Sequence, residues 1–292
     1  MDQLWGLWPN DLFGRWRYPS ALVGGIVWRN KPSLKEVNMN VLITAGSTMT
    51  MIDQVRGLTN IFHGTTGRKI AEFLAPHHQV TLVTSGSPKL IDRNFELIDS
   101  WEPWERHGLR HSRGFGFGCS VDDVHMKVIC FRTFDELAQI MEQEIRTGEY
   151  DVIIHSAAVS DFQVESVWKE KNNGRLEQID ASTKISSSHP ELYLKLVPTF
   201  KIIDKIRSEW GFAGKLVKFK LQVGMADEEL IAIAKRSRQT SEADLIVANC
   251  LEWSHDYAYI INANDEVVKV TREELPKALW TMLRQAQHDK GE

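Results

Sequence analysis

The stretch that decides the fold reads VLITAGSTMTMIDQVRGLTNIFHGTTGRK and spans residues 41–69. Its first residues form a short apolar run, which is typical of a buried strand. Gly46, Ser47 and Thr48 come next, and they let the backbone turn sharply with its N–H groups facing outward. The apolar residues that recur at helical spacing after Gly67 predict a helix, whose N-terminus attracts anions. We therefore expect a strand, a long loop and a helix that together provide two positions for a phosphate.

The glycine spacing excludes the usual dinucleotide fingerprint, G-x-G-x-x-G, which places its glycines together directly after the strand. For Gly46 alone, an ordinary connection between a strand and a helix is an equally good explanation. A second turn of small residues, with polar side chains between the two turns, favours a loop that binds a ligand. The residues concerned are Asp53, Arg56, Asn60, Gly64, Thr65, Thr66 and Gly67.

From residue 41 onward, runs typical of strands alternate with runs typical of helices. This alternation predicts an α/β fold of three layers, with a doubly wound, mostly parallel, Rossmann-like sheet. The expected strands are 41–45, 80–84, 127–131, 151–156, 216–221 and 244–248, and the expected helices are 65–75, 134–147, 199–208 and 226–241. Ligands of such sheets bind beyond the carboxyl ends of the strands. Residues 46, 157–161, 220 and 249 all fall there, so we expect them to share one pocket.

Four segments depart from this alternation. Residues 1–38 contain Trp5, Trp8, Trp16 and Trp28 without a helical or strand period, so they form an N-terminal extension of uncertain structure. In one interpretation, the tryptophans anchor this segment to the core or over the site. In the other, which we prefer, translation starts at Met39 or the segment is a loosely attached tail. Residues 100–120 are expected to be a surface loop and residues 165–190 a mobile flap, whereas 257–261 and 267–270 predict a C-terminal β-hairpin.

Composition excludes some classes of binding partner and indicates the cellular compartment. The formal net charge of −4 gives no basic field for nucleic acid or an anionic membrane. The cysteines Cys119, Cys130 and Cys250 are odd in number and lack C-x-x-C spacing, which argues against a disulfide framework or structural zinc and fits a reducing cytoplasm. No apolar run is long enough to span a membrane.

Residues 43–67 resemble the opening of phosphopantothenate–cysteine ligase, also called phosphopantothenoylcysteine synthetase, in its stand-alone bacterial form. Four further motifs are similar to those of this family and follow in the same order. They are AAVSDF at 157–162, KISS at 184–187, FKL at 219–221 and ADLIVAN at 243–249. The resemblance runs from about residue 39 to about residue 283, and it implies a single ligase domain over residues 39–292.

The resemblance implies an activity in coenzyme A biosynthesis. Such a ligase forms the amide between 4′-phosphopantothenate and cysteine through an acyl-nucleotide intermediate, because a free carboxylate does not acylate an amine at neutral pH. The implied co-substrate is CTP, favoured over ATP, with Mg²⁺. The resemblance also implies a homodimer that the C-terminal hairpin helps to build.

The resemblance assigns catalytic roles to Asn60 and Lys184. Asn60 would donate a hydrogen bond to the acyl oxygen, and Lys184, on the flap, would neutralise charge as pyrophosphate leaves. From the residues alone, Asn60 as the cap of a turn and Lys184 as a solvated lysine are the simpler explanations. The nucleotide and phosphate would be bound by Gly46, Ser47, Thr48, Gly64, Thr65, Thr66, Gly67, Ala157, Ala158, Asp161, Phe219, Lys220 and Asn249.

Asp161 would also contact Mg²⁺, although a carboxylate that caps the next turn explains it as well. Two departures from the family pattern put activity in doubt: Gln222 replaces a common glutamate, and residues 61–63 replace a more serine-rich stretch. A non-catalytic nucleotide-binding or sensing protein on the same fold is therefore an alternative. An NAD(P)-dependent reductase fits less well because none of the 5 tyrosines begins a Tyr-x-x-x-Lys pair. A P-loop is also excluded, because Leu216 follows Gly214 and Lys215.

Overall fold

The computed structural model describes residues 38–85, 117–121, 124–171 and 174–288. The chain divides into two units, residues 1–36 and 37–292. The predicted N-terminal extension, apart from residue 38, and most of the predicted loop 100–120 lie outside the described residues.

A sheet of nine strands forms the centre, in the order β14-β13-β12-β11-β7-β1-β4-β6-β5. The strands from β12 to β6 pair in parallel, and the pairs at both edges are antiparallel. This confirms the predicted, mostly parallel α/β sheet. The strands are β1 (Asn40–Ala45), β4 (Gln79–Thr84), β5 (Phe117–Val121), β6 (Val124–Cys130), β7 (Val152–His155), β11 (Lys215–Gln222), β12 (Leu245–Cys250), β13 (Tyr257–Ile261) and β14 (Val267–Thr271).

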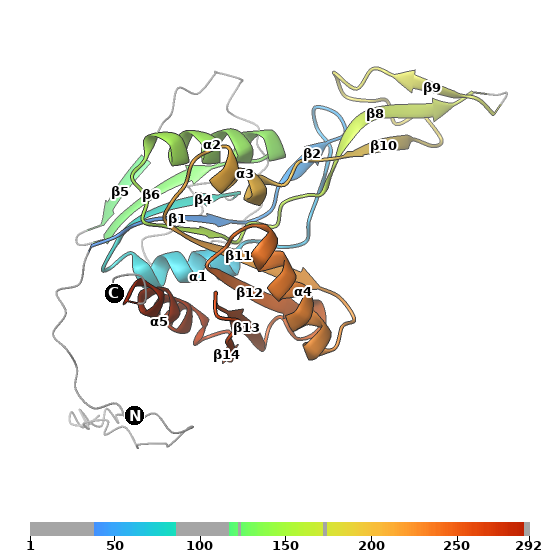
Figure 1. Ribbon diagram of the computed structural model, residues 1–292. Coiled ribbons are helices and arrows are strands. Elements are labelled where there is room, and N and C mark those ends of the chain that lie inside the picture. The colour runs from blue at the N-terminus through green and yellow to red at the C-terminus, as the bar shows by residue number, and fades with distance from the viewer. Residues whose placement is uncertain (1–37, 86–116, 122–123, 172–173, 289–292) are drawn as a thin grey trace, which may run out of the picture. The chain divides into compact units, whose positions relative to one another are not determined.

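Helices cover both faces of this sheet, as Figure 1 shows. α1 (Thr65–Leu74) and α5 (Leu275–His288) pack on one face, against Val41 and Ile43 of β1. α2 (Phe134–Thr147) and α3 (Ile202–Ser208) pack on the other, against Leu42 and Ile153. α4 (Asp227–Thr240) lies over β11 and β12. Because both faces are covered, the central strands are buried along almost their whole length, as their apolar runs predicted.

Local sequence explains where the helices begin. α2 starts with a capping box, in which Thr133 Oγ1 accepts the N–H of Glu136 and the Glu136 carboxylate accepts the N–H of Thr133. All four predicted helices are present, and α2 has the predicted bounds. α5 was not predicted. No helix among the described residues is long and apolar enough to cross a membrane.

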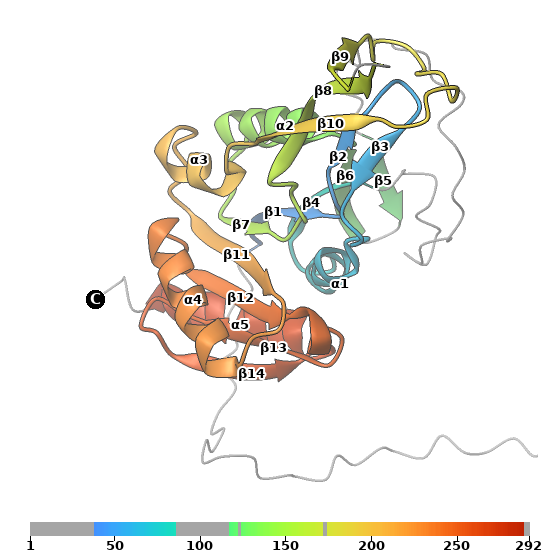
Figure 2. The same ribbon diagram turned by 90° about the vertical axis from the view of Figure 1, so that its right-hand side faces the viewer.

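The strand order places a switch point between β1 and β7. After β1 the chain builds β4 and β6 on one side and then returns to add β7 and β11 on the other side of β1 (Figure 2). The two connections therefore leave the carboxyl ends of β1 and β7 in opposite directions, which opens a crevice between these ends. In doubly wound sheets this crevice is where ligands bind.

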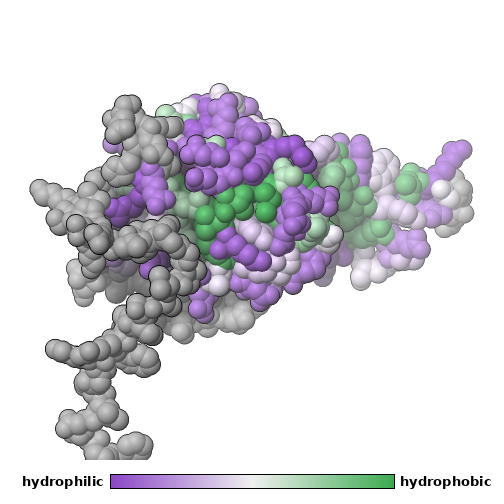
Figure 3. Space-filling view, turned by 60° about the horizontal axis from the view of Figure 1, so that its bottom comes forward, coloured by the Kyte–Doolittle hydropathy of each residue, from purple (hydrophilic) through white to green (hydrophobic). Residues whose placement is uncertain are grey.

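A second, three-stranded antiparallel sheet projects from this domain (Figure 1). It consists of β8 (Phe162–Glu170), β9 (Leu176–Ile179) and β10 (Tyr193–Pro198), and β2 (Met49–Met51) and β3 (Gly57–Thr59) form a small ribbon beside β8. Within the predicted flap over 165–190, residues 165–170 and 176–179 are strands. These strands carry many exposed polar residues, because the sheet is only partly covered, and their composition resembles that of a loop. Figure 3 shows apolar surface on this sheet, where Phe162, Leu176 and Leu196 are exposed.

The C-terminal hairpin is confirmed, with β13 and β14 paired around a turn at Asn262–Glu266 in which Asp265 has a φ of 63°. The loop predicted over 100–120 was wrong at its end, because Phe117–Val121 form the edge strand β5. Its sequence, FGCSV, is short and contains glycine, so it has no clear alternation of apolar and polar residues.

Candidate functional site

The turns that follow β1 and β7 are bound to each other in the crevice. Ala158 donates its N–H to Gly46 O at 2.8 Å, and Thr48 donates its N–H to Ala158 O at 3.3 Å. Gly46 has a φ of 84°, a left-handed conformation that glycine adopts without strain. The two turns therefore form one rigid floor at the switch point.

The sequence suggested that the N–H groups of the first turn face outward, but two of them are bonded within the protein. Ser47 donates its N–H to Ser85 Oγ at 3.1 Å, and the N–H of Thr48 is used by Ala158. These donors stabilise the turn itself. An anion above this turn would have to be bound by other groups.

Asn60 lies over the floor of the crevice. Its Nδ2 donates to Ala158 O at 2.9 Å, and Ser47 Oγ donates to Asn60 O at 3.3 Å. An amide nitrogen carries two hydrogens, so one of them remains for a ligand. The predicted catalytic residue and the predicted binding residues Ser47, Thr48 and Ala158 are thus brought together.

The first turn of α1 packs directly on the ends of β1 and β7. A Cβ on Gly64, whose φ is 78°, would lie 2.1 Å from Gly46 N, and a Cβ on Gly67 would lie 2.4 Å from Ser156 Oγ. Both glycines are therefore needed for the close approach, a role that the sequence did not reveal. Among the residues that the structure describes, no side chain caps this helix at Gly64, which leaves its N-terminal N–H groups for a ligand.

A buried pair fixes the position of Ala157. Thr44 Oγ1 accepts the N–H of Ala157 at 3.1 Å and lies 2.9 Å from His155 Nδ1. The hydroxyl proton can then go to Nδ1, which assigns the ring proton to Nε2. Burial and, to a smaller extent, the charge of Lys218 lower the pKa of His155 to about 4, so the ring is neutral at neutral pH.

The loop between β1 and α1 holds the segment that contains Lys184. Asp53 Oδ2 accepts the N–H of Ile185 at 3.1 Å, and Arg56 Nη2 donates to Ile185 O at 2.7 Å. Burial alone would raise the pKa of the Asp53 carboxyl, but hydrogen bonds, chiefly from Arg56, hold it well below its usual range. Lys184 itself is exposed, in the irregular segment between β9 and β10. Asp53 and Arg56 also form an ion pair within this loop.

The remaining predicted residues lie further along the same edge of the sheet. Asn249 stands opposite Leu221 near the carboxyl ends of β12 and β11, and Phe219 and Lys220 directly precede Leu221. Asp161, just before β8, is exposed and forms an ion pair with Lys201. Asn60 and Asn249 therefore share one edge, separated by the width of β7 and β11.

Sequence reasoning missed two lysines in this region, Lys201 and Lys218. Lys218 is buried and donates to Ser237 O at 3.0 Å. The pKa of Lys218 is lowered to about 8, chiefly by burial; the charges of Lys220 and Lys201 also lower it, whereas Asp204 opposes the shift. A lysine within an apolar strand has no sequence pattern that marks it as functional. The strand order is needed to know which residues lie next to it.

The described residues contain no group of three or more His, Cys, Asp or Glu side chains that could hold a metal ion. Lys201 pairs with one oxygen of Asp161, the predicted magnesium ligand, and does not occupy the other. A single carboxylate suits a magnesium ion that takes most of its ligands from phosphate and water.

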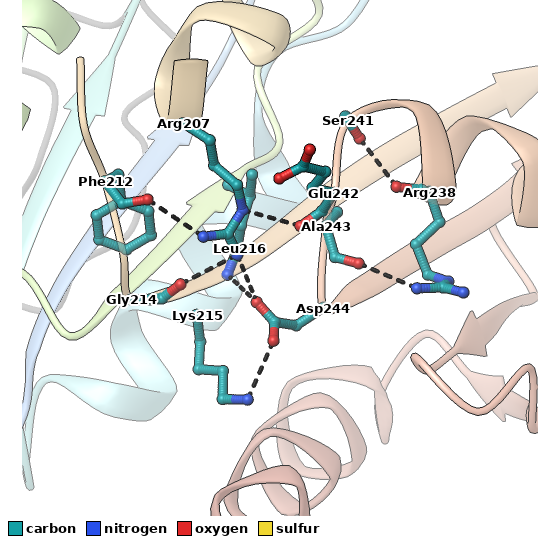
Figure 4. Close-up of polar contacts among 10 residues, drawn as sticks. All are labelled: Arg207, Phe212, Gly214, Lys215, Leu216, Arg238, Ser241, Glu242, Ala243 and Asp244. Carbon is teal, nitrogen blue, oxygen red and sulfur yellow. Dashed lines mark hydrogen bonds and ion pairs between the residues drawn. The ribbon is translucent and has the colours of Figure 1, made fainter. Parts of the chain in front are cut away.

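A second polar cluster lies at the opposite edge, where β11 and β12 begin. Arg207 and Lys215 converge on Asp244, at 2.8 and 3.0 Å, beside a hollow of about 740 Å³ (Figure 4). Asp244 also accepts the N–H of Leu216 at 2.9 Å. Both carboxylate oxygens are occupied, so this cluster ties α3, β11 and β12 together and is no part of the crevice.

Sequence comparison relates the chain to known proteins. The family model described as the DNA/pantothenate metabolism flavoprotein C-terminal domain matches residues 37–99 and 118–287. The coenzyme A biosynthesis bifunctional protein CoaBC of Thermococcus kodakarensis is 30% identical over 248 residues, which cover 82% of this chain and 49% of that protein. The protein of the same name from Methanocaldococcus jannaschii is 26% identical over 262 residues, 88% of this chain and 50% of that one. The chain thus spans about half the length of these relatives.

Solved structures show the same fold. The DNA/pantothenate metabolism flavoprotein from Streptococcus pneumoniae is 26% identical with a TM-score of 0.61, covering 85% of this chain and 99% of that one. The Cab2 mutant H337A in complex with phosphopantothenate-cysteine is 17% identical with a TM-score of 0.57, covering 88% and 90%. At this identity the second likeness concerns the fold alone.

Proposed function

Because the chain belongs to the family of DNA/pantothenate metabolism flavoprotein C-terminal domains, we propose that it is a ligase that joins 4′-phosphopantothenate to cysteine in coenzyme A biosynthesis. The observation that carries this proposal is the position of Asn60. Its amide donates a hydrogen bond to Ala158 O at the switch point, between the N-terminus of α1 and the end of β7. This arrangement suits a substrate that carries a phosphate at one end and a reacting carboxylate at the other.

The acid substrate would bind along the first turn of α1. The N–H groups of Thr65, Thr66 and Gly67 are suited to its phosphate, since anions bind at helix N-termini. Asn60 would donate its second amide hydrogen to the carboxylate oxygen that gains charge when the acyl-nucleotide forms and reacts. The rigid floor supports this role, because a donor held in place costs little reorganisation.

The nucleoside triphosphate would bind at the ends of β7 and β11. The charges of Lys201, Lys218 and Lys220 lie close enough to affect one another, which supports a polyanionic ligand there. Lys184 would approach from the segment held by Asp53 and Arg56, so that its ammonium group neutralises charge as pyrophosphate leaves. Magnesium, carried by the triphosphate, would supply further neutralisation of the phosphate charge, with Asp161 as its protein contact. CTP is the favoured nucleotide on the resemblance of the motifs, with ATP as the alternative.

The proposed partner is a second copy of the chain. The proposed location of the protein is the cytoplasm. β14 is an edge strand whose Val267 and Val268 are 38% and 40% exposed, which supports pairing through the hairpin. Light scattering after size exclusion should give twice the mass of one chain, and replacement of both valines by lysine should lower it. A wild-type protein with the mass of one chain would exclude the homodimer.

A single assay tests the activity. The purified protein is mixed with phosphopantothenate, cysteine, Mg²⁺ and CTP, and pyrophosphate release is followed. Release that requires phosphopantothenate supports the ligase, and competition between CTP and ATP identifies the nucleotide. Nucleotide binding without turnover would point to a sensing protein, and oxidation of NAD(P)H would point to a reductase.

A further inference from the structure

Arg272 connects the C-terminal hairpin to the first turn of α1. It lies between β14 and α5, where its N–H donates to Asp256 O at 3.0 Å. Its Nη2 donates to Thr66 Oγ1, a residue 206 positions earlier in the chain. The guanidinium group therefore lies beside the N–H groups that we assign to a phosphate.

Arg272 differs from three other arginines in its charge partners. Arg56, Arg207 and Arg238 each form an ion pair with an aspartate, whereas Arg272 forms none with the residues that the structure describes. Its Nη1 is buried and lacks a hydrogen-bond partner in the same part of the chain. Burial lowers the pKa of this guanidinium group. A buried charge and an unused donor both cost stability, so a group at this position is expected to have an anionic partner.

The surroundings add to the positive potential. The N-terminus of α1 carries a partial positive charge and has no side-chain cap. On the same turn, Arg68 Nε is also buried without a hydrogen-bond partner among the described residues. An arginine next to free helix N–H groups is the combination that proteins use to bind phosphate.

We propose that Arg272 binds a phosphate group of a substrate at the first turn of α1 through its unpaired Nη1. The inference rests on the proposed function for the identity of the substrate. The phosphate belongs either to phosphopantothenate or to the nucleoside triphosphate, and the measurement of separate KM values distinguishes these sources.

Steady-state kinetics of Arg272→Gln and Arg272→Lys test this role. In Arg272→Gln we expect KM for one phosphorylated substrate to rise at least about tenfold, with kcat changed less than about threefold and KM for cysteine unchanged. Arg272→Lys should recover part of the loss, because it keeps the charge. Lys277→Gln, which removes an exposed charge on α5, is the matched control and should behave as wild type. Unchanged KM values in Arg272→Gln, or a rise for cysteine alone, would overturn the proposal.

Thermal unfolding with inorganic phosphate gives a readout that needs no turnover. Phosphate should raise the midpoint of the wild type and of Lys277→Gln above that in chloride of equal ionic strength, but not the midpoint of Arg272→Gln. Without phosphate, Arg272→Gln should be at least as stable as wild type, because an unpaired charge is removed; lower stability would indicate a purely structural arginine. Phosphate stabilisation that needs Arg272 in a protein without ligase activity would leave this site standing and refute only the proposed function.

Discussion

Replacement of Gly67 by alanine tests the contact between α1 and the ends of β1 and β7. The added Cβ would lie 2.4 Å from Ser156 Oγ, 2.8 Å from Ala45 Cβ and 2.9 Å from Thr44 O. The Ser156 hydroxyl can rotate away, although it would lose its bond to Thr44 O at 2.5 Å. The other two atoms belong to β1 and cannot move independently of the sheet, so the helix itself must shift.

The expected cost follows from two opposing effects. Overpacking of a buried contact costs about 1–3 kcal/mol, and the higher helix propensity of alanine returns at most about 1 kcal/mol. We therefore expect Gly67→Ala to lower the free energy of unfolding by about 1–2 kcal/mol. The shift also moves the N–H groups of the first turn away from Asn60, so KM for phosphopantothenate should rise several-fold.

Urea unfolding followed by circular dichroism measures the first effect, and initial rates measure the second. Lys69→Ala, at an exposed position on the same helix, is the control and should leave both quantities nearly unchanged. If Gly67→Ala were as stable as the wild type, with an unchanged KM, the close contact would not be what requires glycine at this position.

Four further substitutions have defined outcomes. Asn60→Asp and Lys184→Ala should each lower turnover at least about tenfold, or about 1.4 kcal/mol of transition-state stabilisation, and wild-type rates in the pyrophosphate assay would refute both roles. Asp244→Asn should lower the free energy of unfolding by about 3 kcal/mol, because it leaves two partly buried cations without their carboxylate; a calorimetric loss below about 1 kcal/mol would contradict that reasoning. His155 has a pKa of about 4 in the folded protein, below the 6.5 of an ordinary histidine, so its contribution to stability is complete above pH 6.5 and is lost as the pH falls toward 4. His155→Gln should flatten the decline in unfolding free energy over this interval, and an unchanged slope would show that His155 does not cause it.

The sequence was sufficient to predict the central strands, because a parallel strand covered on both faces leaves a short, continuous apolar run. It also located Gly46 and Ala158 at strand ends and Asn60 in the loop that follows Gly46. It indicated no strand over residues 165–170 and 176–179, since strands exposed to solvent on much of their surface lack the burial pattern that marks a strand. Gly64 and Gly67 were interpreted as phosphate-binding residues, and only the coordinates reveal that their missing side chains allow α1 to touch β1.

Strand order and long-range contacts lay beyond what a single sequence can provide. The crevice depends on β7 returning to the side of β1 opposite β4, and no local pattern encodes that choice. The bond from Arg272 to Thr66 joins residues 206 positions apart, so an arginine after a hairpin looked like any surface charge. Lys218 and His155 were missed for the same reason, because they become neighbours only when β11 pairs with β7.

Isotope exchange tests whether acid and nucleoside triphosphate meet at the carboxyl ends of the adjacent strands β1, β7 and β11. Labelled pyrophosphate is incubated with the protein, Mg²⁺ and CTP or ATP without cysteine, and label in the triphosphate is measured. Exchange of pyrophosphate into the triphosphate should require phosphopantothenate, and its rate should be lower in Asn60→Asp. Exchange without the acid, or amide formation without any exchange, would contradict this expectation.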